Sequence, residues 1–194
     1  MYYKGFNKDM TCKGFQYEEG KEYHEEEATV CEKGFHACEY PLDCFNYYTP
    51  VESVFHEVEL GEDAHGDGND TKKCSKSIKV GSRLDIAGII KAAINYTTKN
   101  CIDGKSAGNQ SAISGGDQSA LSGGYRSAIS GGNRSVLRGG EECKYRGGLW
   151  SIFAAEIWDN GQLIGVKTAV VDGENIKPDT WYQFDGKEFI ESNE

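Results

Sequence analysis

The sequence predicts an α+β N-terminal domain, a short octapeptide-repeat β-solenoid of the β-roll type, and a C-terminal antiparallel β cap. Three observations predict this order: mixed helix and strand patterns in residues 1–101, aligned octads in residues 102–148, and apolar segments separated by turn signals in residues 149–194. A hydrophobic content of 38% over 194 residues is enough for these parts to bury a core. We therefore expect three domains with these boundaries.

Residues 1–101 contain the two periodicities of an α+β domain. Pro41 begins a segment that ends near Tyr48 and predicts a short helix, because proline is favoured in the first helical turn. Residues 51–60 alternate apolar with polar side chains, which predicts a half-buried strand. Residues 84–96 have apolar side chains at helical spacing and predict a helix with one buried face.

The repeat reads SAISGGDQ, SALSGGYR, SAISGGNR and SVLRGGEE over residues 111–142. Each octad combines a four-residue β stretch with a Gly-Gly turn, and we expect these glycines to supply positive φ angles and close backbone approach. Disordered Gly/Ser-rich segments do not keep Ala or Val and Ile or Leu in register over four repeats. If two octads form one flattened coil, the segment supplies about two to three coils.

Two apolar stripes follow from the repeat, because successive side chains point to opposite faces of a strand. They are Ala112, Ala120, Ala128 and Val136, and Ile113, Leu121, Ile129 and Leu137. One stripe fills the coil and the other needs a flanking domain or another subunit, so we expect a homo-oligomer interface within this set. The sequence leaves open which stripe faces inward. The octads resemble the left-handed β-roll repeats of trimeric bacterial adhesin heads, and this resemblance implies a trimer.

The cap is predicted from three strand-like segments, residues 149–158, 162–171 and 181–189. Asp159-Asn160-Gly161 and Asp172-Gly173 between them are hairpin turn signals. An open solenoid end needs such a cap because bare edge strands invite uncontrolled pairing.

Composition excludes several function classes. A net charge of −10 argues against a sequence-independent nucleic-acid binder, and we expect no sequence-specific nucleic-acid partner. The opening residues MYYKGFNKD lack a basic segment followed by an apolar one, so we expect no signal peptide. The longest apolar stretch, residues 86–94, is interrupted by Lys91, so we expect no membrane partner. Seven cysteines without regular pairing indicate free thiols in a reducing cytoplasm.

Charge is segregated along the chain: residues 1–70 hold 17 acidic and 5 basic side chains, whereas residues 71–101 hold 1 and 7. The basic band in the second segment either complements the acidic segment or meets an anionic ligand. It contains Lys72, Lys73, Lys76, Lys79 and Arg83.

The richest stretch for chemistry is CEKGFHACEYPLDCFNYY, residues 31–48. Its cysteines and histidine lack the C-x-x-C spacing of a zinc site, and a Cys-His nucleophile pair would lack an orienting third group. We therefore expect no metal, no cofactor and no catalytic residue, with the cysteines and aromatic side chains serving as core.

Aromatic and basic residues of the first domain form a candidate ligand pocket instead. Stacking faces for a base and a cation for a phosphate are what a nucleotide site needs. Core packing is the alternative explanation for the aromatic members. The candidate residues are Tyr3, Lys4, Phe35, His36, Tyr47, Tyr48 and Glu57.

The order of the motifs Tyr3-Lys4-Gly5, Gly34–Ala37 and Phe55–Glu59 resembles a reduced ADP-ribosyltransferase fold over about the first 60 residues. Lys4 stands where such enzymes carry His or Arg. The resemblance implies a pocket for an NAD-derived nucleotide with impaired catalysis. It also implies ADP-ribosyl transfer as the enzymatic alternative, with Lys4, Tyr47 and Glu57 or Glu59 as the residues to test.

The full layout resembles an uncharacterised family of phage and prophage proteins. The motifs that carry the resemblance are YKGF, CKGFQYEEGKEY, CEKGFHACEYPLDCFNYY, the octads and IKPDTWYQFDGKEFIE. It implies a viral accessory protein made in the cytoplasm of a bacterial host. We therefore expect a non-enzymatic binding protein that antagonises antiviral defence, either by sequestering a nucleotide signal or by docking on a host defence protein. A virion component trimerised by the solenoid is the structural alternative.

Overall fold

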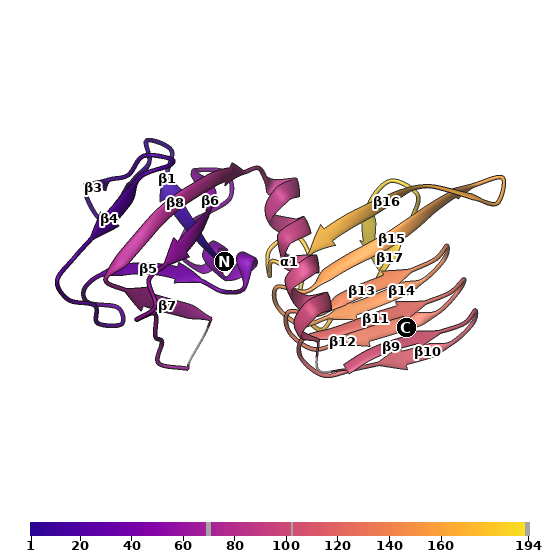
Figure 1. Cartoon of the computed structure of the whole chain (residues 1–194). Helices are drawn as coiled ribbons and strands as arrows, with labels where there is room; N and C mark the ends of the chain where they lie inside the picture. The colour runs from indigo at the N-terminus through magenta and orange to yellow at the C-terminus, as the bar shows by residue number, and fades with distance from the viewer. Residues whose placement is uncertain (69–70, 102, 193–194) are drawn as a thin grey trace. The chain divides into compact units, whose positions relative to one another are not determined.

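The computed structural model describes residues 1–68, 71–101 and 103–192 of the chain (Figure 1). It divides into two compact units, Met1–Ala93 and Ile94–Glu194. Strands dominate both units, and helix α1 (Ile86–Asn100) spans the boundary in the sequence. Among the described residues, no helix is both long and apolar enough to span a bilayer.

The first unit is built on a six-stranded sheet in the order β4-β8-β6-β1-β5-β7. Every neighbouring pair in this sheet is antiparallel. A separate hairpin, β2 (Thr11–Cys12) with β3 (Phe15–Gln16), turns at Lys13-Gly14. The sheet strands are β1 (Tyr2–Asn7), β4 (Glu22–His24), β5 (Phe35–Cys38), β6 (Ser53–Leu60), β7 (Lys72–Ser75) and β8 (Ser77–Leu84).

The expected elements of this unit are present, but its class is corrected. Residues 51–60 contain β6, and residues 41–48 contain the 3-10 helix η1 (Pro41–Asn46) with proline in its first turn. Helix α1 begins after Asp85, whose Oδ1 accepts the Gly88 N–H at 2.7 Å and caps the first turn. The α+β prediction was wrong because the short strands β2, β3, β4 and β7 carry too little periodicity to be recognised, and with them the unit is mostly β.

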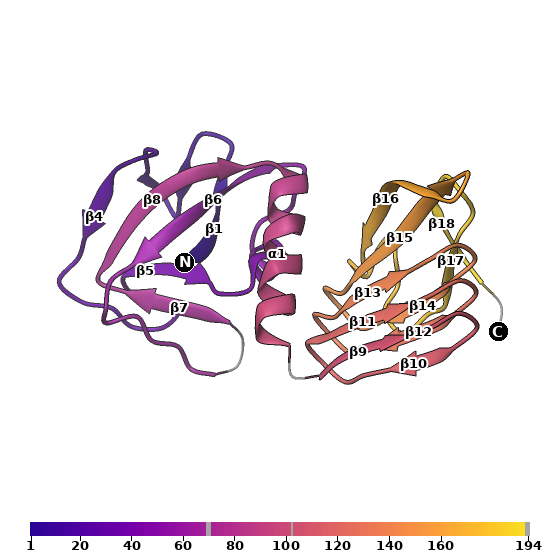
Figure 2. The same cartoon turned by 45° about the vertical axis from the view of Figure 1, so that its right-hand side comes forward.

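The second unit confirms the β-solenoid. Strands sixteen residues apart pair in parallel, so that Ala112 faces Ala128 and Ala120 faces Val136. Two octads therefore make one coil, and residues 104–155 form about three coils (Figure 2). One sheet contains β9 (Asp103–Ala107), β11 (Ser119–Gly123), β13 (Val136–Gly139) and β15 (Ile152–Asp159), and the other contains β10 (Ala112–Ser114), β12 (Ala128–Gly131) and β14 (Lys144–Gly147).

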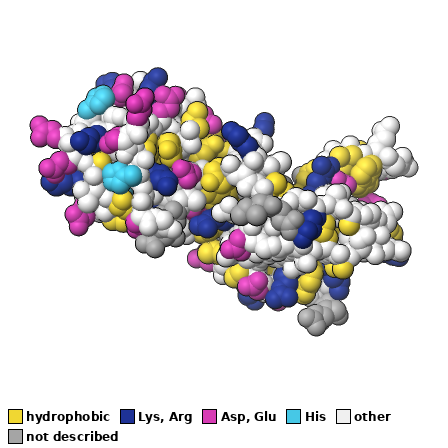
Figure 3. Space-filling view, turned by 60° about the horizontal axis from the view of Figure 1, so that its bottom comes forward, with side chains coloured by type: hydrophobic (Ala, Val, Ile, Leu, Met, Phe, Trp, Pro, Cys, Tyr) yellow, Lys and Arg dark blue, Asp and Glu magenta, His cyan; other side chains and the backbone are white. Residues whose placement is uncertain are grey.

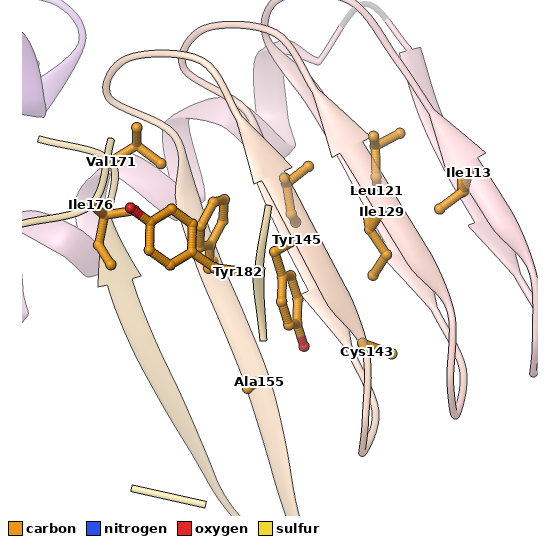
Figure 4. Close-up of a cluster of buried hydrophobic side chains, with 11 residues drawn as sticks. Ile113, Leu121, Ile129, Cys143, Tyr145, Ala155, Val171, Ile176 and Tyr182 are labelled. Carbon is orange, nitrogen blue, oxygen red and sulfur yellow. The ribbon is translucent and has the colours of Figure 1, made fainter. Parts of the chain in front are cut away.

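The stripe of larger side chains faces the coil interior. Ile113, Leu121, Ile129 and Leu137 are at most 8% exposed and pack with Tyr145 in one core cluster (Figure 4). These four were included in the predicted oligomer interface, and the structure assigns them to the core of the coil instead.

The second stripe points out of the coil. Ala112 is exposed, Ala120 and Ala128 are half-buried, and Val136 is buried. An oligomer interface on the solenoid stays a prediction, and this outward stripe is the part that could form it.

The corners of the coil correct the expected role of the glycines. Positive φ angles occur at the last octad position, as in Gln118 and Arg126, and not at the Gly-Gly pairs. The glycines provide room: a Cβ on Gly132 would lie 2.7 Å from the Asp117 amide nitrogen of the previous coil. Because the two backbones approach so closely at Gly132, Asp117 Oδ1 accepts the N–H of Asn133 in the next coil at 2.8 Å.

Buried serines link the coils in the same way. Ser135 Oγ accepts the Ser119 N–H at 3.1 Å, and Ser151 Oγ accepts the Ser135 N–H at 3.0 Å. Each hydroxyl therefore satisfies a backbone donor that the tight corner leaves unpaired.

The C-terminal strands extend both solenoid sheets. Strand β16 (Gln162–Val170) pairs antiparallel with β15 through a turn at Asn160-Gly161, where both φ angles are positive. Strand β17 (Tyr182–Phe184) adds to β14, and β18 (Phe189–Glu191) adds to β17. The predicted antiparallel cap is present with two differences. Residues 152–159 form the last strand that pairs in parallel with the solenoid, and the segment predicted as one strand at residues 181–189 contains β17 and the first residue of β18.

Candidate functional site

A pocket of about 520 Å³ lies in the Met1–Ala93 unit. Its walls come from β1, the β2–β3 hairpin, the loop before β5, β5 itself and the end of η1. A volume of this size is in the range of small-molecule sites in proteins.

The structure brings five of the seven predicted ligand residues to this pocket: Tyr3, Lys4, His36, Tyr47 and Tyr48. Phe35 is not among its lining residues, because it is 2% exposed and packs in the sheet core.

Glu57 also lies outside the pocket lining. It pairs with Tyr3 across β1 and β6, where burial first and then the Glu57 charge raise the pKa of Tyr3. Glu59 is exposed on the same strand.

Lys4 is the most unusual polar side chain of the site, since only 6% of it is exposed. Its Nζ donates to the His36 carbonyl oxygen at 2.8 Å and bonds the Cys12 thiol. Burial lowers the pKa of Lys4, while Cys12, Cys44 and Cys38 act in the opposite direction. Among the described residues, no carboxylate lies within ion-pair distance of this ammonium, although buried charges are normally paired.

Gly5 allows an aromatic ring to close the pocket over β1. A Cβ at this position would lie 2.6 Å from the Tyr48 ring, so only glycine lets the ring rest on the strand. Tyr48 Oη then donates to Cys12 Sγ at 2.9 Å, which connects the end of η1 with the β2–β3 hairpin. Burial is the main reason that the pKa of Tyr48 is raised.

His36 holds the loop before β5 rather than offering a free imidazole. Its Nε2 accepts the Cys31 N–H at 2.9 Å, and its Nδ1 lies 3.1 Å from the Gly34 carbonyl oxygen, to which it donates. Burial lowers the pKa of His36, and the positive charges of Lys4, Lys13 and Lys72 lower it further. The ring is therefore neutral with both nitrogens engaged, and three lysine charges act on one point of the pocket.

Lys72 and Tyr47 also line the pocket and contact each other. The Lys72 Nζ lies 4.7 Å from the centre of the Tyr47 ring and 3.1 Å from its hydroxyl, which accepts a hydrogen bond. Tyr47 itself is 48% exposed, and Lys72 supplies its cation–π contact.

Sequence reasoning missed the β2–β3 hairpin wall, which contributes Cys12, Lys13, Phe15 and the adjoining Tyr17. The available signal was the Lys13-Gly14 pair between two short segments, because both residues adopt the positive φ angles of a two-residue hairpin turn. Lys72 was noted as part of the basic band, and of that band it is the member that lines the pocket.

Neither a metal centre nor a disulfide is part of the site as the described residues form it. No group of three His, Cys, Asp or Glu side chains in the described part of the chain is placed to hold a metal ion. The described cysteines are free thiols. The arrangement places lysine charges and partly exposed aromatic rings around one cavity.

Comparison with known proteins gives one match. No curated protein matches the chain, and no solved structure does. Neither the phage resemblance nor the ADP-ribosyltransferase resemblance is supported by a match. Residues 1–92, which contain the whole pocket lining, match the family described as a domain of unknown function, DUF7666.

Proposed function

We propose that the Met1–Ala93 unit binds a small anionic ligand with an aromatic ring, of the nucleotide class. The observation that carries the proposal is Lys4, a buried ammonium in the pocket wall with no carboxylate at ion-pair distance among the described residues. Burying an ammonium in this way costs free energy, which an anion bound in the pocket would offset.

The second support is the local charge of the pocket. Lys4, Lys13 and Lys72 all act on His36, and Lys13 stands at a hairpin tip beside the cavity. Lys33 is also in the lining, where Glu27 pairs with it. Glu25 and Glu32 line the pocket as well, so four lysines stand against two carboxylates among its described lining residues. The remaining local excess of positive charge contrasts with the net charge of −10 and fits a phosphate or carboxylate group.

The third support is the aromatic wall. Phe15 is 44% exposed, and its ring is held edge-on by Tyr17 at 4.8 Å and Tyr23 at 5.4 Å. A ring fixed in this way offers a stacking face to a base at little entropic cost.

In the cell, this binding would sequester a nucleotide signal used by antiviral defence, and the protein would act without catalysis in the cytoplasm of a phage-infected bacterium. That context rests on the sequence resemblance alone. Docking on a host defence protein through acidic residues 9–70 is the other mechanism. Neither Glu57 nor Glu59 is among the described residues that line the pocket, which does not favour ADP-ribosyl transfer.

The proposal is tested by thermal melts of the full chain against ADP-ribose, cyclic ADP-ribose isomers and cyclic dinucleotides. A ligand specific for the folded state adds about 2.7 kcal/mol at a hundredfold excess over Kd. Lys4→Met should abolish the shift, whereas the control Lys79→Met, an exposed lysine outside the pocket, should retain it.

Two results would redirect the proposal. If no nucleotide shifts the melt and a host protein co-purifies with the wild type, docking replaces the pocket mechanism. Transfer of label from NAD to protein in a bacterial lysate would favour the enzyme instead.

A further inference from the structure

The hairpin formed by β15 and β16 carries a cluster of large apolar side chains at the surface. Trp158, Leu163, Ile164 and Val166 are between 39% and 64% exposed. Hydrophobic side chains are also visible on the projecting part of the surface in Figure 3. Single exposed apolar residues are ordinary, but four on one hairpin mark an interaction surface.

The strand pairing places three of these side chains on one face. Glu156 lies opposite Val166, and Trp158 lies opposite Leu163. Trp158 Nε1 also donates to Glu156 Oε2 at 3.0 Å, so the two pairs share a side of the hairpin. The pairing is irregular between Ile157 and Trp158, where Ile164 has no partner among the described residues of β15. Ile164 is the most exposed of the four at 64%.

Strand β16 is also the edge of its sheet, which runs β16-β15-β13-β11-β9. Edge strands are normally protected by charge or by short length. The edge strand β10 of the other solenoid sheet has only three residues, and β9, at the opposite edge of the same sheet as β16, carries Lys105. By contrast, β16 has nine residues, with no charge from Gln162 to Val166 and a single lysine at position 167.

We propose that β16 is an interface between two copies of this chain, in which the two β16 strands pair antiparallel about a two-fold axis. A two-fold contact requires a self-complementary segment. Antiparallel pairing brings the uncharged residues 162–166 of each copy together, so that Ile164 and Val166 meet apolar side chains of the partner strand.

Charge supports a second copy rather than an unrelated partner. Each strand contributes one cation, Lys167, and each hairpin tip carries one carboxylate, Asp159. Because the strands run in opposite directions, Lys167 of one copy lies toward the tip of the other, where opposite charges attract. This interface belongs to the Ile94–Glu194 unit and is independent of ligand binding by the first unit.

The test is the oligomeric state of the full chain in sedimentation over a wide concentration range. The wild type should be a dimer at high concentration, and Ile164→Lys together with Val166→Lys should shift the dissociation constant at least a hundredfold. Both positions are exposed, so the monomer should melt at an unchanged temperature. Val51→Lys, at an 83% exposed position of the other unit, is the matched control and should leave the dimer intact.

Hydrogen exchange locates the contact. Amides of β16 should exchange more slowly in the dimer than after dilution to the monomer. A monomer at every concentration overturns the inference, as does capture of a different protein by monomeric chain through β16. A dimer or trimer that is still formed by the variant with both lysine substitutions also overturns it. If Ala120→Asp then dissociates that oligomer, the interface lies on the outward solenoid stripe.

Discussion

The second glycine of each octad pair gives a sharp test of the coil geometry. At Gly132, an added Cβ would lie 2.7 Å from the Asp117 nitrogen and 2.8 Å from the Gly116 carbonyl carbon. Both are backbone atoms of the adjacent coil, held by a Gly132 N–H to Gly116 carbonyl bond of 3.0 Å. At Gly116, the equivalent glycine of the preceding coil, a Cβ would meet nothing within 4 Å.

The two substitutions should therefore differ strongly. Gly132→Ala overpacks a rigid contact, which costs about 1–3 kcal/mol. Gly116→Ala meets no contact and should be neutral or stabilising by about 0.4–1 kcal/mol, because alanine restricts the unfolded chain more than glycine does. For a domain of about 100 residues, each kcal/mol corresponds to a Tm change of roughly 4–8 °C.

Urea and thermal unfolding followed by circular dichroism measure both variants against the wild type. Equal losses of stability would refute the reasoning, since they would mean that the glycines are needed for backbone freedom rather than for space. Destabilisation by Gly116→Ala alone would show that another chain packs on the first coil.

Three further predictions concern single hydrogen bonds and close contacts in the two units. Ser135→Ala leaves the Ser119 N–H without its acceptor and should lower the free energy of unfolding by about 1–3 kcal/mol in urea titrations. The pKa of His36 is lowered in the folded state, so the unfolded state binds more protons in acid. The free energy of unfolding should therefore decrease as the pH falls through about 6.5 toward the lower pKa of the folded state. Melts at a series of pH values should show a weaker pH dependence for His36→Gln. Gly5→Ala should displace Tyr48 and weaken the nucleotide-induced shift in Tm, whereas an unchanged shift would separate Tyr48 from the site.

The solenoid was predictable from sequence because its signal repeats. Four octads in register determine the strands, the sixteen-residue coil and the two stripes. The direction of the stripes was not predictable, since both alanine and isoleucine can face a core. In the structure the larger side chains face inward, because Leu121 and Ile129 fill an interior that alanine side chains would leave partly empty.

The pocket was predictable only in part, for a related reason. Tyr3, Lys4 and His36 belong to short motifs that stand out in the sequence, and the sheet brings them together. The hairpin wall with Lys13 comes from two-residue strands, and the burial of Lys4 depends on contacts between β1, β2 and β5, which no local pattern encodes.

The response of ligand binding to salt distinguishes buried from surface electrostatics. With 17 acidic and 5 basic side chains in residues 1–70, the chain repels an approaching anion, and salt screens this repulsion beyond a Debye length of about 8 Å at physiological ionic strength. The contact of a bound anion with Lys4 is buried and screened much less.

Raising the salt concentration should therefore increase the association rate of the nucleotide and change its dissociation rate little, a pattern opposite to that of a basic surface. Stopped-flow binding at low and physiological ionic strength measures both rates. Association that slows with salt would contradict this prediction and would mean that the accessible charges of Lys13 and Lys72, rather than the acidic surface, govern the approach of the ligand.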